Sequence, residues 1–151
     1  MSVMIRQAEE ADLPAILKLY AQPEIDDGDV LPVEDAAVVF RRFAGYPDYR
    51  LFVAEQDGAI VGSYALLIMD NIGHRGACSA VVEDVVVDPK CQGAGIGKVM
   101  MRTALNEAGR KGCYKLALSA NQKRDRAHAF YESLGFDRHG YSFLVKLEET
   151  R

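Results

Sequence analysis

The sequence lacks any apolar run that approaches the roughly 20 residues a membrane-spanning helix needs. Residues 1–6 also lack the long apolar core of a secretory signal peptide. We therefore expect a cytoplasmic protein with no membrane partner.

Cysteine and histidine are both scarce. The cysteines Cys78, Cys91 and Cys113 are odd in number and far apart, and they form no Cys-x-x-Cys pair. They indicate neither a disulfide framework nor a zinc site, and free, partly buried thiols are the simpler interpretation. The three histidines do not have the spacing of metal ligands beside an acidic partner, so the sequence predicts no metal site.

Acidic residues outnumber basic ones, which gives a formal net charge of −4. A protein that binds nucleic acid favours a basic face, so we expect no nucleic-acid partner. Mild acidity suits a cationic substrate, although the same charge also serves solubility.

What the chain does contain is typical of one globular domain. It has 151 residues, of which 49% are hydrophobic and 26% are charged. No internal repeat, low-complexity segment or linker interrupts it, so we expect a single domain over residues 1–151.

The N-terminal half predicts two helices and a run of strands. After a strand at 3–7, Asp12 is expected to cap a helix, and a second helix places Val39 on its apolar face. An Asp-Gly pair at 57–58 predicts a hairpin between two strands. A mostly antiparallel meander is predicted from the first strand together with 51–55, 60–69 and 80–88.

The C-terminal half has a different character, since helical spacing alternates with short apolar runs. The pattern predicts helices at 95–111 and 126–134 and strands at 115–119 and 141–147.

A glycine-rich loop joins the third long strand to the helix that follows it. Gly93, Gly95 and Gly97 leave backbone N–H groups uncovered and open a helix whose N-terminus carries partial positive charge. Such a loop suits a phosphate or pyrophosphate. A tight turn without a ligand is the alternative, but one glycine would be enough for a turn.

Two common phosphate motifs do not fit this loop. A P-loop would need glycine and Ser or Thr at positions that hold Gln92 and Val99. A dinucleotide fingerprint that starts at Gly93 would need glycine at Lys98.

The remaining pattern is Gln92-x-x-Gly95-x-Gly97, preceded by Val-Val-Val-Asp-Pro at 85–89, and Tyr131 is followed by Gly-Phe at 135–136. In this order the two patterns resemble the GCN5-related N-acetyltransferase (GNAT) superfamily, most strongly from 81 to 136. The resemblance implies an α+β fold with a mixed central sheet, antiparallel at first and closing with a parallel pair, and helices on both faces.

The same resemblance implies transfer of acetyl from acetyl-CoA to a primary amine by direct attack. Residues 83–85 and 112–115 look like glucosamine-6-phosphate N-acetyltransferases, whereas 121–124 look like small-amine and aminoalkylphosphonate acetyltransferases. A small metabolite is therefore the expected acceptor. A protein or peptide N-acetyltransferase and a non-catalytic acyl-CoA-binding regulatory module are the alternatives.

Cofactor contacts follow from the resemblance, residue by residue. Many members carry Asn seven residues before the Tyr, where this chain has Arg124, and Asn121 stands three residues earlier. Lys123 and Arg124 are further candidates to meet CoA phosphates. The implied cofactor-binding residues are Val85, Val86, Val87, Gln92, Gly93, Ala94, Gly95, Ile96, Gly97, Lys98, Asn121, Arg126 and Tyr131.

Acetyl transfer to an amine needs a base for the ammonium and an acid for the leaving thiolate. Tyr131 is the candidate acid, because a phenol with a pKa of about 10 is protonated at neutral pH; a half-buried aromatic is its alternative interpretation. Glu83 is the candidate base. A carboxylate bonded to a neighbouring strand or side chain is the other interpretation of Glu83.

Strand alternation puts Glu83, Val85 and Val87 on one face and Asp84 on the other. The family's strand often carries a bulge, which would turn Asp84 inward instead.

Two further expectations concern partners. The acidic stretch 24–29 falls where the family binds substrate and would select a cationic acceptor, or it is simply a solvated loop. Family members commonly pair through sheet edges, so we expect a homodimer with the apolar stretch 141–147 as a possible edge.

Overall fold

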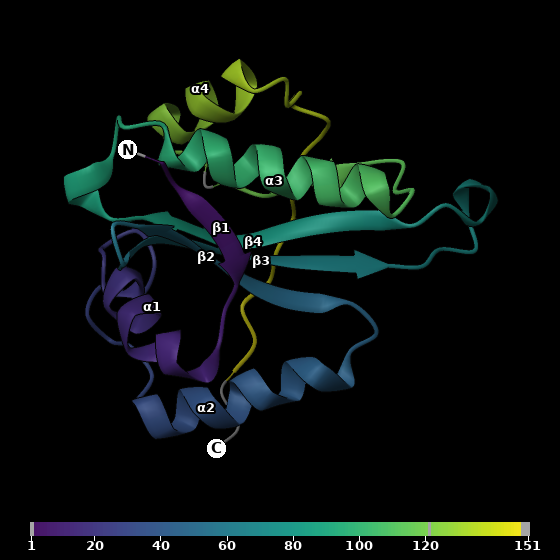
Figure 1. Ribbon diagram of the computed structural model, residues 1–151. Coiled ribbons are helices and arrows are strands. Elements are labelled where there is room, and N and C mark those ends of the chain that lie inside the picture. Colours follow the sequence, from purple (N-terminus) through teal and green to yellow (C-terminus); the bar gives the residue numbers. More distant parts are fainter. Residues whose placement is uncertain (1, 121, 149–151) are drawn as a thin grey trace. The chain divides into compact units, whose positions relative to one another are not determined.

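A computed structural model of the chain describes residues 2–120 and 122–148 (Figure 1). They fall into two compact units, Met1–Leu118 and Ser119–Arg151, and each unit is described by itself. Within the described part of the chain, no helix is both long enough and apolar enough to cross a membrane.

A five-stranded mixed sheet organises the first unit. Its strands are neighbours in chain order, and the first four pair antiparallel while the last two pair parallel. This arrangement confirms the mixed sheet expected from the sequence. The strands are β1 (Met4–Gln7), β2 (Tyr49–Gln56), β3 (Ala59–Met69), β4 (Ser79–Val87) and β5 (Leu116–Ala117).

The hairpin between β2 and β3 turns at the predicted Asp-Gly pair. Asp57 has φ 53° and Gly58 has φ 79°, so both central residues occupy the left-handed region that a tight hairpin turn of this kind requires. The turn chemistry therefore sets the register of β2 and β3.

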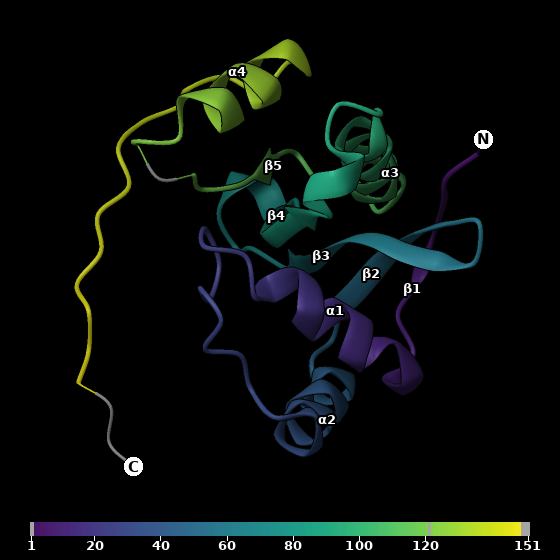
Figure 2. The ribbon, with the colours of Figure 1, turned by 90° about the vertical axis from the view of Figure 1, so that its left-hand side faces the viewer.

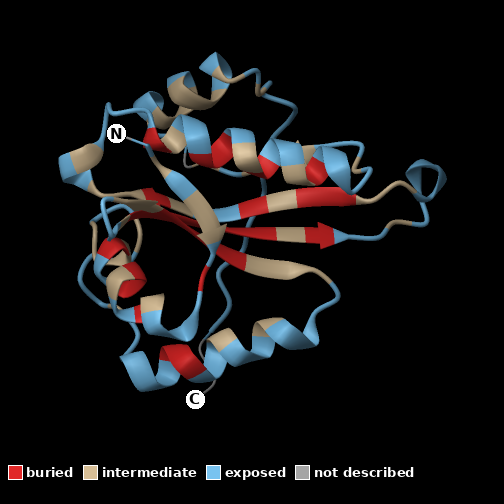
Figure 3. Ribbon diagram, viewed as in Figure 1, coloured by how far each residue is buried: buried red, intermediate tan, exposed pale blue. Residues whose placement is uncertain are grey.

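Helices cover both faces of this sheet, as predicted. Figure 2 shows α1 (Leu13–Tyr20) and α2 (Val33–Arg42) on one face and α3 (Ile96–Arg110) on the other. Figure 3 shows the buried residues gathered along the strands and the inner sides of the helices.

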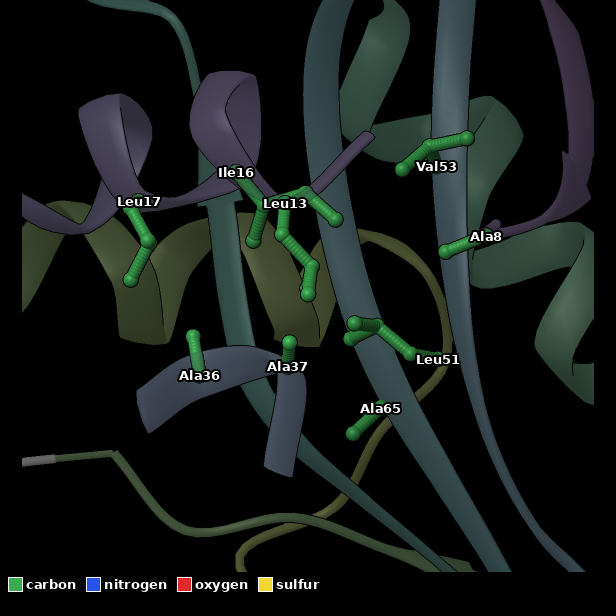
Figure 4. Close-up of a cluster of buried hydrophobic side chains, with 9 residues drawn as sticks. All are labelled: Ala8, Leu13, Ile16, Leu17, Ala36, Ala37, Leu51, Val53 and Ala65. Atoms are coloured by element: carbon green, nitrogen blue, oxygen red, sulfur yellow. The ribbon is translucent and has the colours of Figure 1, made fainter. Parts of the chain in front are cut away.

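The core beneath α1 and α2 is built from small and aliphatic side chains (Figure 4). Its members are Ala8, Leu13, Ile16, Leu17, Ala36, Ala37, Leu51, Val53 and Ala65. Neighbouring side chains alternate along a strand, so Ala65 and Gly62 of β3 face opposite sides of the sheet. Gly62 faces α3, where an added Cβ would meet Met100 Sδ at 2.6 Å. Helix α3 therefore packs very closely on the sheet.

Two local predictions about the helices were wrong. Asp12 precedes α1, but its carboxylate makes no cap hydrogen bond to the helix. It accepts hydrogen bonds from the Arg6 guanidinium at 2.8 Å and from the Glu9 N–H at 2.7 Å instead, because an ionic partner lies within reach. Val39 does not lie on the buried face of α2, whose buried residues are Ala36 and Ala37.

The predicted strand at 141–147 is also wrong, because residues 141–148 form no strand. Alternating apolar residues form a strand only when a neighbour completes the hydrogen bonds. The predicted strand at 115–119 is shorter than expected, because only Leu116–Ala117 form β5. The large apolar side chains of this stretch are 79–93% exposed, namely Tyr141, Phe143, Leu144, Val145 and Leu147.

The described residues of the second unit include the helix α4 (Asp125–Ser133), which is close to its predicted bounds. Gly135 follows it with φ 94°, a conformation that glycine adopts without strain.

Candidate functional site

Strand β4 changes its pairing halfway along its length. Its parallel pairing with β5 joins Ala80 to Leu116 and Val81 to Ala117. From Val82 onward, β4 has no parallel partner within 2–120 and 122–148. The two strands therefore separate, and an edge of this kind presents backbone N–H and C=O groups to a ligand.

One group on the second half of β4 is already engaged. The Gln22 side-chain amide donates a hydrogen bond to the Val87 carbonyl at 3.0 Å, and thereby ties the loop after α1 to the end of the strand. The carbonyl of Val87 is thus a weaker candidate for a cofactor contact than the backbone of Val85 or Val86.

A bulge interrupts β4 at Asp84. Glu83 pairs with Ala65 and Val86 pairs with Ser63, so Asp84 and Val85 together stand opposite the single residue Tyr64. Asp84 has φ 53°, an uncommon conformation that Asp tolerates better than most residues.

Because of the bulge, the predicted alternation of side chains along β4 is wrong. Because one extra residue is inserted, Glu83 shares a sheet face with Val86 and not with Val85 and Val87. That face also carries Ala65, a member of the core beneath α1 and α2. Glu83 therefore lies on the sheet face covered by α1 and α2, not on the face covered by α3.

Two tyrosines lie within electrostatic reach of Asp84. Burial raises the pKa of Tyr49, and the negative charges of Asp84 and Glu83 raise it further. Burial also raises the pKa of Tyr20, with Asp84 adding to the rise and a hydrogen bond with Ser63 opposing it. Both phenols therefore stay protonated at neutral pH.

The pKa of Asp84 is itself raised, by burial first and by the charge of Asp26 second. The residue as a whole is exposed, so this desolvation is partial. Asp26 belongs to the acidic stretch 24–29 after α1, so that stretch acts electrostatically on the bulge. A carboxyl with a raised pKa is better suited to accept a proton near neutral pH.

Sequence reasoning missed two members of this group, Tyr20 and Tyr49, whereas Asp26 falls in the acidic stretch that the sequence had singled out. The approach of the two tyrosines to Asp84 depends on how α1 and the start of β2 lie against β4, and no local pattern encodes that geometry.

Two glycines of the glycine-rich loop have left-handed backbone conformations. Gly93 has φ 86° and Gly95 has φ 84°, and an added Cβ at either residue would meet nothing within 4 Å. No side chain caps the N-terminus of α3, so the first N–H groups of the helix have no side-chain partner at the cap. Ile96 is 1% exposed and anchors the helix start.

Other residues of the loop lie at the surface near the N-terminus of α3. Gln92, Ala94 and Lys98 are exposed, and the Asp88 side chain holds the preceding turn by accepting the Lys90 N–H at 2.9 Å. Within the loop, the Ala94 N–H donates a hydrogen bond to the Cys91 carbonyl at 3.2 Å.

A cavity of about 330 Å³ opens beside the start of β2. Tyr49, whose pKa responds to Asp84 and Glu83, lines this cavity, but no residue of the glycine-rich loop does. Its lining residues are Gln7, Glu10, Phe40, Arg41, Phe43, Ala44, Tyr46, Pro47, Asp48, Tyr49, Arg50 and Leu51.

In the second unit, Tyr131 lies on α4 with its ring 5.2 Å from Phe130 and 5.7 Å from Phe136. Burial raises the pKa of Tyr131, while nearby Arg124 lowers it, so the phenol remains a proton donor at neutral pH. Arg126 is exposed on the first turn of α4. The predicted contact residue Asn121 lies outside the described residues.

Metal ligands are not gathered anywhere in the described part of the chain, where no group of three or more His, Cys, Asp or Glu side chains could hold an ion.

Comparisons with known proteins extend these observations. The model of the Acetyltransferase (GNAT) family matches residues 13–136. A glucosamine 6-phosphate N-acetyltransferase of Trypanosoma brucei brucei is 34% identical over 139 residues, which cover 89% of each chain. A thialysine N-epsilon-acetyltransferase of Bos taurus is 30% identical over 142 residues, which cover 88% of this chain and 83% of the relative.

A solved structure agrees with the sequences. A putative acetyltransferase from Agrobacterium tumefaciens superposes with a TM-score of 0.87 at 32% identity, covering 95% of this chain and 99% of that one. The predicted fold is thereby confirmed, as is the predicted N-acetyltransferase with acetyl-CoA as its co-substrate. The chain belongs to the acetyltransferase (GNAT) family.

Proposed function

We propose that the acceptor of this acetyltransferase is the primary amine of a small cationic metabolite. Two relatives carry names that refer to small amines, glucosamine 6-phosphate and thialysine. The observation that carries the proposal is the bulge at Asp84, where two adjoining carboxylates and Asp26 create negative potential beside Tyr20 and Tyr49. An ammonium is attracted to such a group before it loses its proton.

We propose a base drawn from the carboxylates of β4. The raised pKa of Asp84 and its position in the bulge put Asp84 ahead of Glu83, which strand alternation alone had favoured. Glu83 then helps to hold the ammonium near Tyr49. The base removes the proton directly or through a water, and the free amine attacks the acetyl carbonyl without a covalent enzyme intermediate.

Tyr131 is the proposed acid. Its phenol is protonated at neutral pH, and it supplies the proton that the departing CoA thiolate takes up.

The proposed cofactor cradle combines the loop and the edge of β4. Amides from Gly93 to Lys98 meet the pyrophosphate at the start of α3, and the backbone of Val85 and Val86 meets the pantetheine arm. Arg126 and Asn121 remain further candidates for the CoA phosphates.

We also propose a single cytoplasmic domain that forms a homodimer and binds no nucleic acid. The exposed apolar stretch 141–147 supports the dimer, since burying it against a second copy would remove a large apolar surface from water. Light scattering of the wild type should show a dimer, and Val145→Asp should shift it toward monomer. A wild-type monomer at working concentration contradicts the dimer.

The test of the proposed function is a screen of CoA-thiol release from acetyl-CoA against amino acids, polyamines, amino sugars and aminoalkylphosphonates. We expect turnover with at least one small amine. Turnover with peptides alone would support a protein acetyltransferase instead. Thermal stabilisation by acetyl-CoA without thiol release over amines and peptides would support a non-catalytic acyl-CoA-binding module.

A further inference from the structure

Cys78 and Cys113 are 35 positions apart in the chain, and their Sγ atoms lie 3.1 Å apart. Cys78 immediately precedes β4, and Cys113 lies between α3 and β5. Both side chains are partly exposed. The wide spacing in the sequence gave no sign of this pair.

Backbone hydrogen bonds just after the two cysteines hold their segments together. The Tyr114 N–H donates to the Cys78 carbonyl at 2.9 Å, and the Ala80 N–H donates to the Lys115 carbonyl at 3.0 Å. The Sγ atoms lie 3.1 Å apart, so an S–S bond of about 2.05 Å needs them to approach by only about 1 Å.

We propose that Cys78 and Cys113 are a site of reversible oxidation, where a peroxide converts the two thiols into an intramolecular disulfide. The peroxide first oxidises the Cys78 thiol to a sulfenic acid and is reduced to water. The Cys113 sulfur then attacks the Cys78 sulfur, an S–S bond forms, and the hydroxyl leaves as a second water with the Cys113 proton.

The surroundings of the two thiols favour this order. Burial first, and Cys78 second, raise the pKa of Cys113, which favours Cys78 as the thiol that the peroxide oxidises first.

The ring closed by this bond contains all of β4, the glycine-rich loop and α3. A cross-link over that length restricts the unfolded chain much more than the folded one, in which the sulfurs already meet. Oxidation should therefore raise the melting temperature by several degrees, about 5–10 °C. This inference does not rest on the proposed substrate or on any catalytic residue.

Peptide mapping of the full-length protein under non-reducing conditions tests the proposal. After treatment with hydrogen peroxide, we expect a linked peptide containing Cys78 and Cys113, which dithiothreitol separates. Cys91→Ser is the matched control, because it removes the third thiol and should leave both the link and the rise in melting temperature unchanged. Cys113→Ser should lose both.

Because wild type and Cys91→Ser carry the primary readout, the test does not depend on how Cys113→Ser folds. A peroxide-treated wild type that retains both thiols, gains oxygen separately on each, or links only between chains overturns the proposal.

Discussion

The two halves of β4 differ in pairing, burial and chemistry. The first half, from Ser79 to Val82, is regular, pairs with β3 throughout and with β5 at Ala80 and Val81, and includes Val82 at 2% exposure. The second half bulges at Asp84, separates from β5 and presents two exposed carboxylates. One strand thus supplies stability at its beginning and, in our proposal, chemistry at its end.

This contrast has a physical basis. Regular pairing buries apolar side chains and satisfies the backbone, whereas a bulge gives up ladder hydrogen bonds and turns extra side chains toward one face. An acetyltransferase that needs free backbone groups and a carboxylate with a raised pKa gains both from the irregular half. Substitutions in the two halves should therefore have separable effects on stability and turnover.

The largest expected effect is at the loop that follows the irregular half. Gly95→Asp should abolish the rise in melting temperature that acetyl-CoA causes, because a carboxylate would stand where the pyrophosphate belongs. In the wild type, ligand at one hundred times its Kd stabilises the fold by about 2.7 kcal/mol. Differential scanning fluorimetry with and without acetyl-CoA measures the change.

Gly95→Asn is the matched control for that substitution. It has nearly the same size and tolerates a positive φ as well as Asp does, but it carries no charge, so part of the thermal response should remain. A folded Gly95→Asp protein with a full response would mean that the loop does not hold the cofactor.

Tyr131→Phe tests the acid separately from β4. The substitution keeps the ring contacts with Phe130 and Phe136 and removes only the proton donor. Turnover should fall by about 10²–10⁴ if protonation of the thiolate limits the rate, while acetyl-CoA binding persists. Steady-state kinetics and thermal shift, measured on the same preparation, would reject the assignment if turnover were unchanged.

Val82→Ala tests the regular half. Losing two buried methyl groups should reduce the free energy of unfolding by about 2 kcal/mol, with turnover of the folded protein largely retained. Val85→Ala, at a half-buried position beyond the bulge, should cost less. Urea denaturation of both variants gives the comparison, and a larger loss at Val85 would contradict the division of the strand.

The smallest expected effect concerns the stability cost of Asp84. The pKa of Asp84 is higher in the folded state than in the unfolded state, so its ionisation disfavours folding. The contribution of Asp84 to stability is therefore fully present below its unfolded pKa and is lost as pH rises through its folded pKa. Asp84→Asn removes this loss and also suits the positive φ.

The Asp84→Asn variant should be more stable than wild type at neutral pH, by no more than about 1 kcal/mol because the group is partly solvated. The gain should disappear as pH falls toward the ordinary Asp pKa of about 3.9. A variant less stable than wild type at neutral pH would show that the Asp84 carboxylate stabilises the fold.

The sequence predicted the fold and the position of the glycine-rich loop because the signals for both are local. The Asp57-Gly58 turn fixes a hairpin, and Gly93 and Gly95 adopt the left-handed conformations that the glycine pattern requires. The bulge at Asp84 was expected only from the resemblance to the family. The sequence itself, with two carboxylates in a valine-rich run, does not show which residue is the one inserted by the bulge. The Cys78–Cys113 approach depends on the β4–β5 register, which has no local signature.

The prediction of a C-terminal strand was wrong for a related reason. Residues 141–147 have the alternation of a strand, but pairing is a property of two segments, and no strand pairs with them within residues 2–120 and 122–148. A pattern within one segment cannot show whether a partner strand is present.

The most direct test of the account is the turnover of Asp84→Asn and Glu83→Gln with one confirmed amine, measured across pH. The account predicts that Asp84→Asn loses about 10²–10⁴ in turnover at neutral pH and recovers partly at high pH, where free amine is abundant. Glu83→Gln should keep most of its turnover and bind the amine more weakly. Wild-type turnover of Asp84→Asn at every pH would contradict the claim that the bulge of β4 supplies the base.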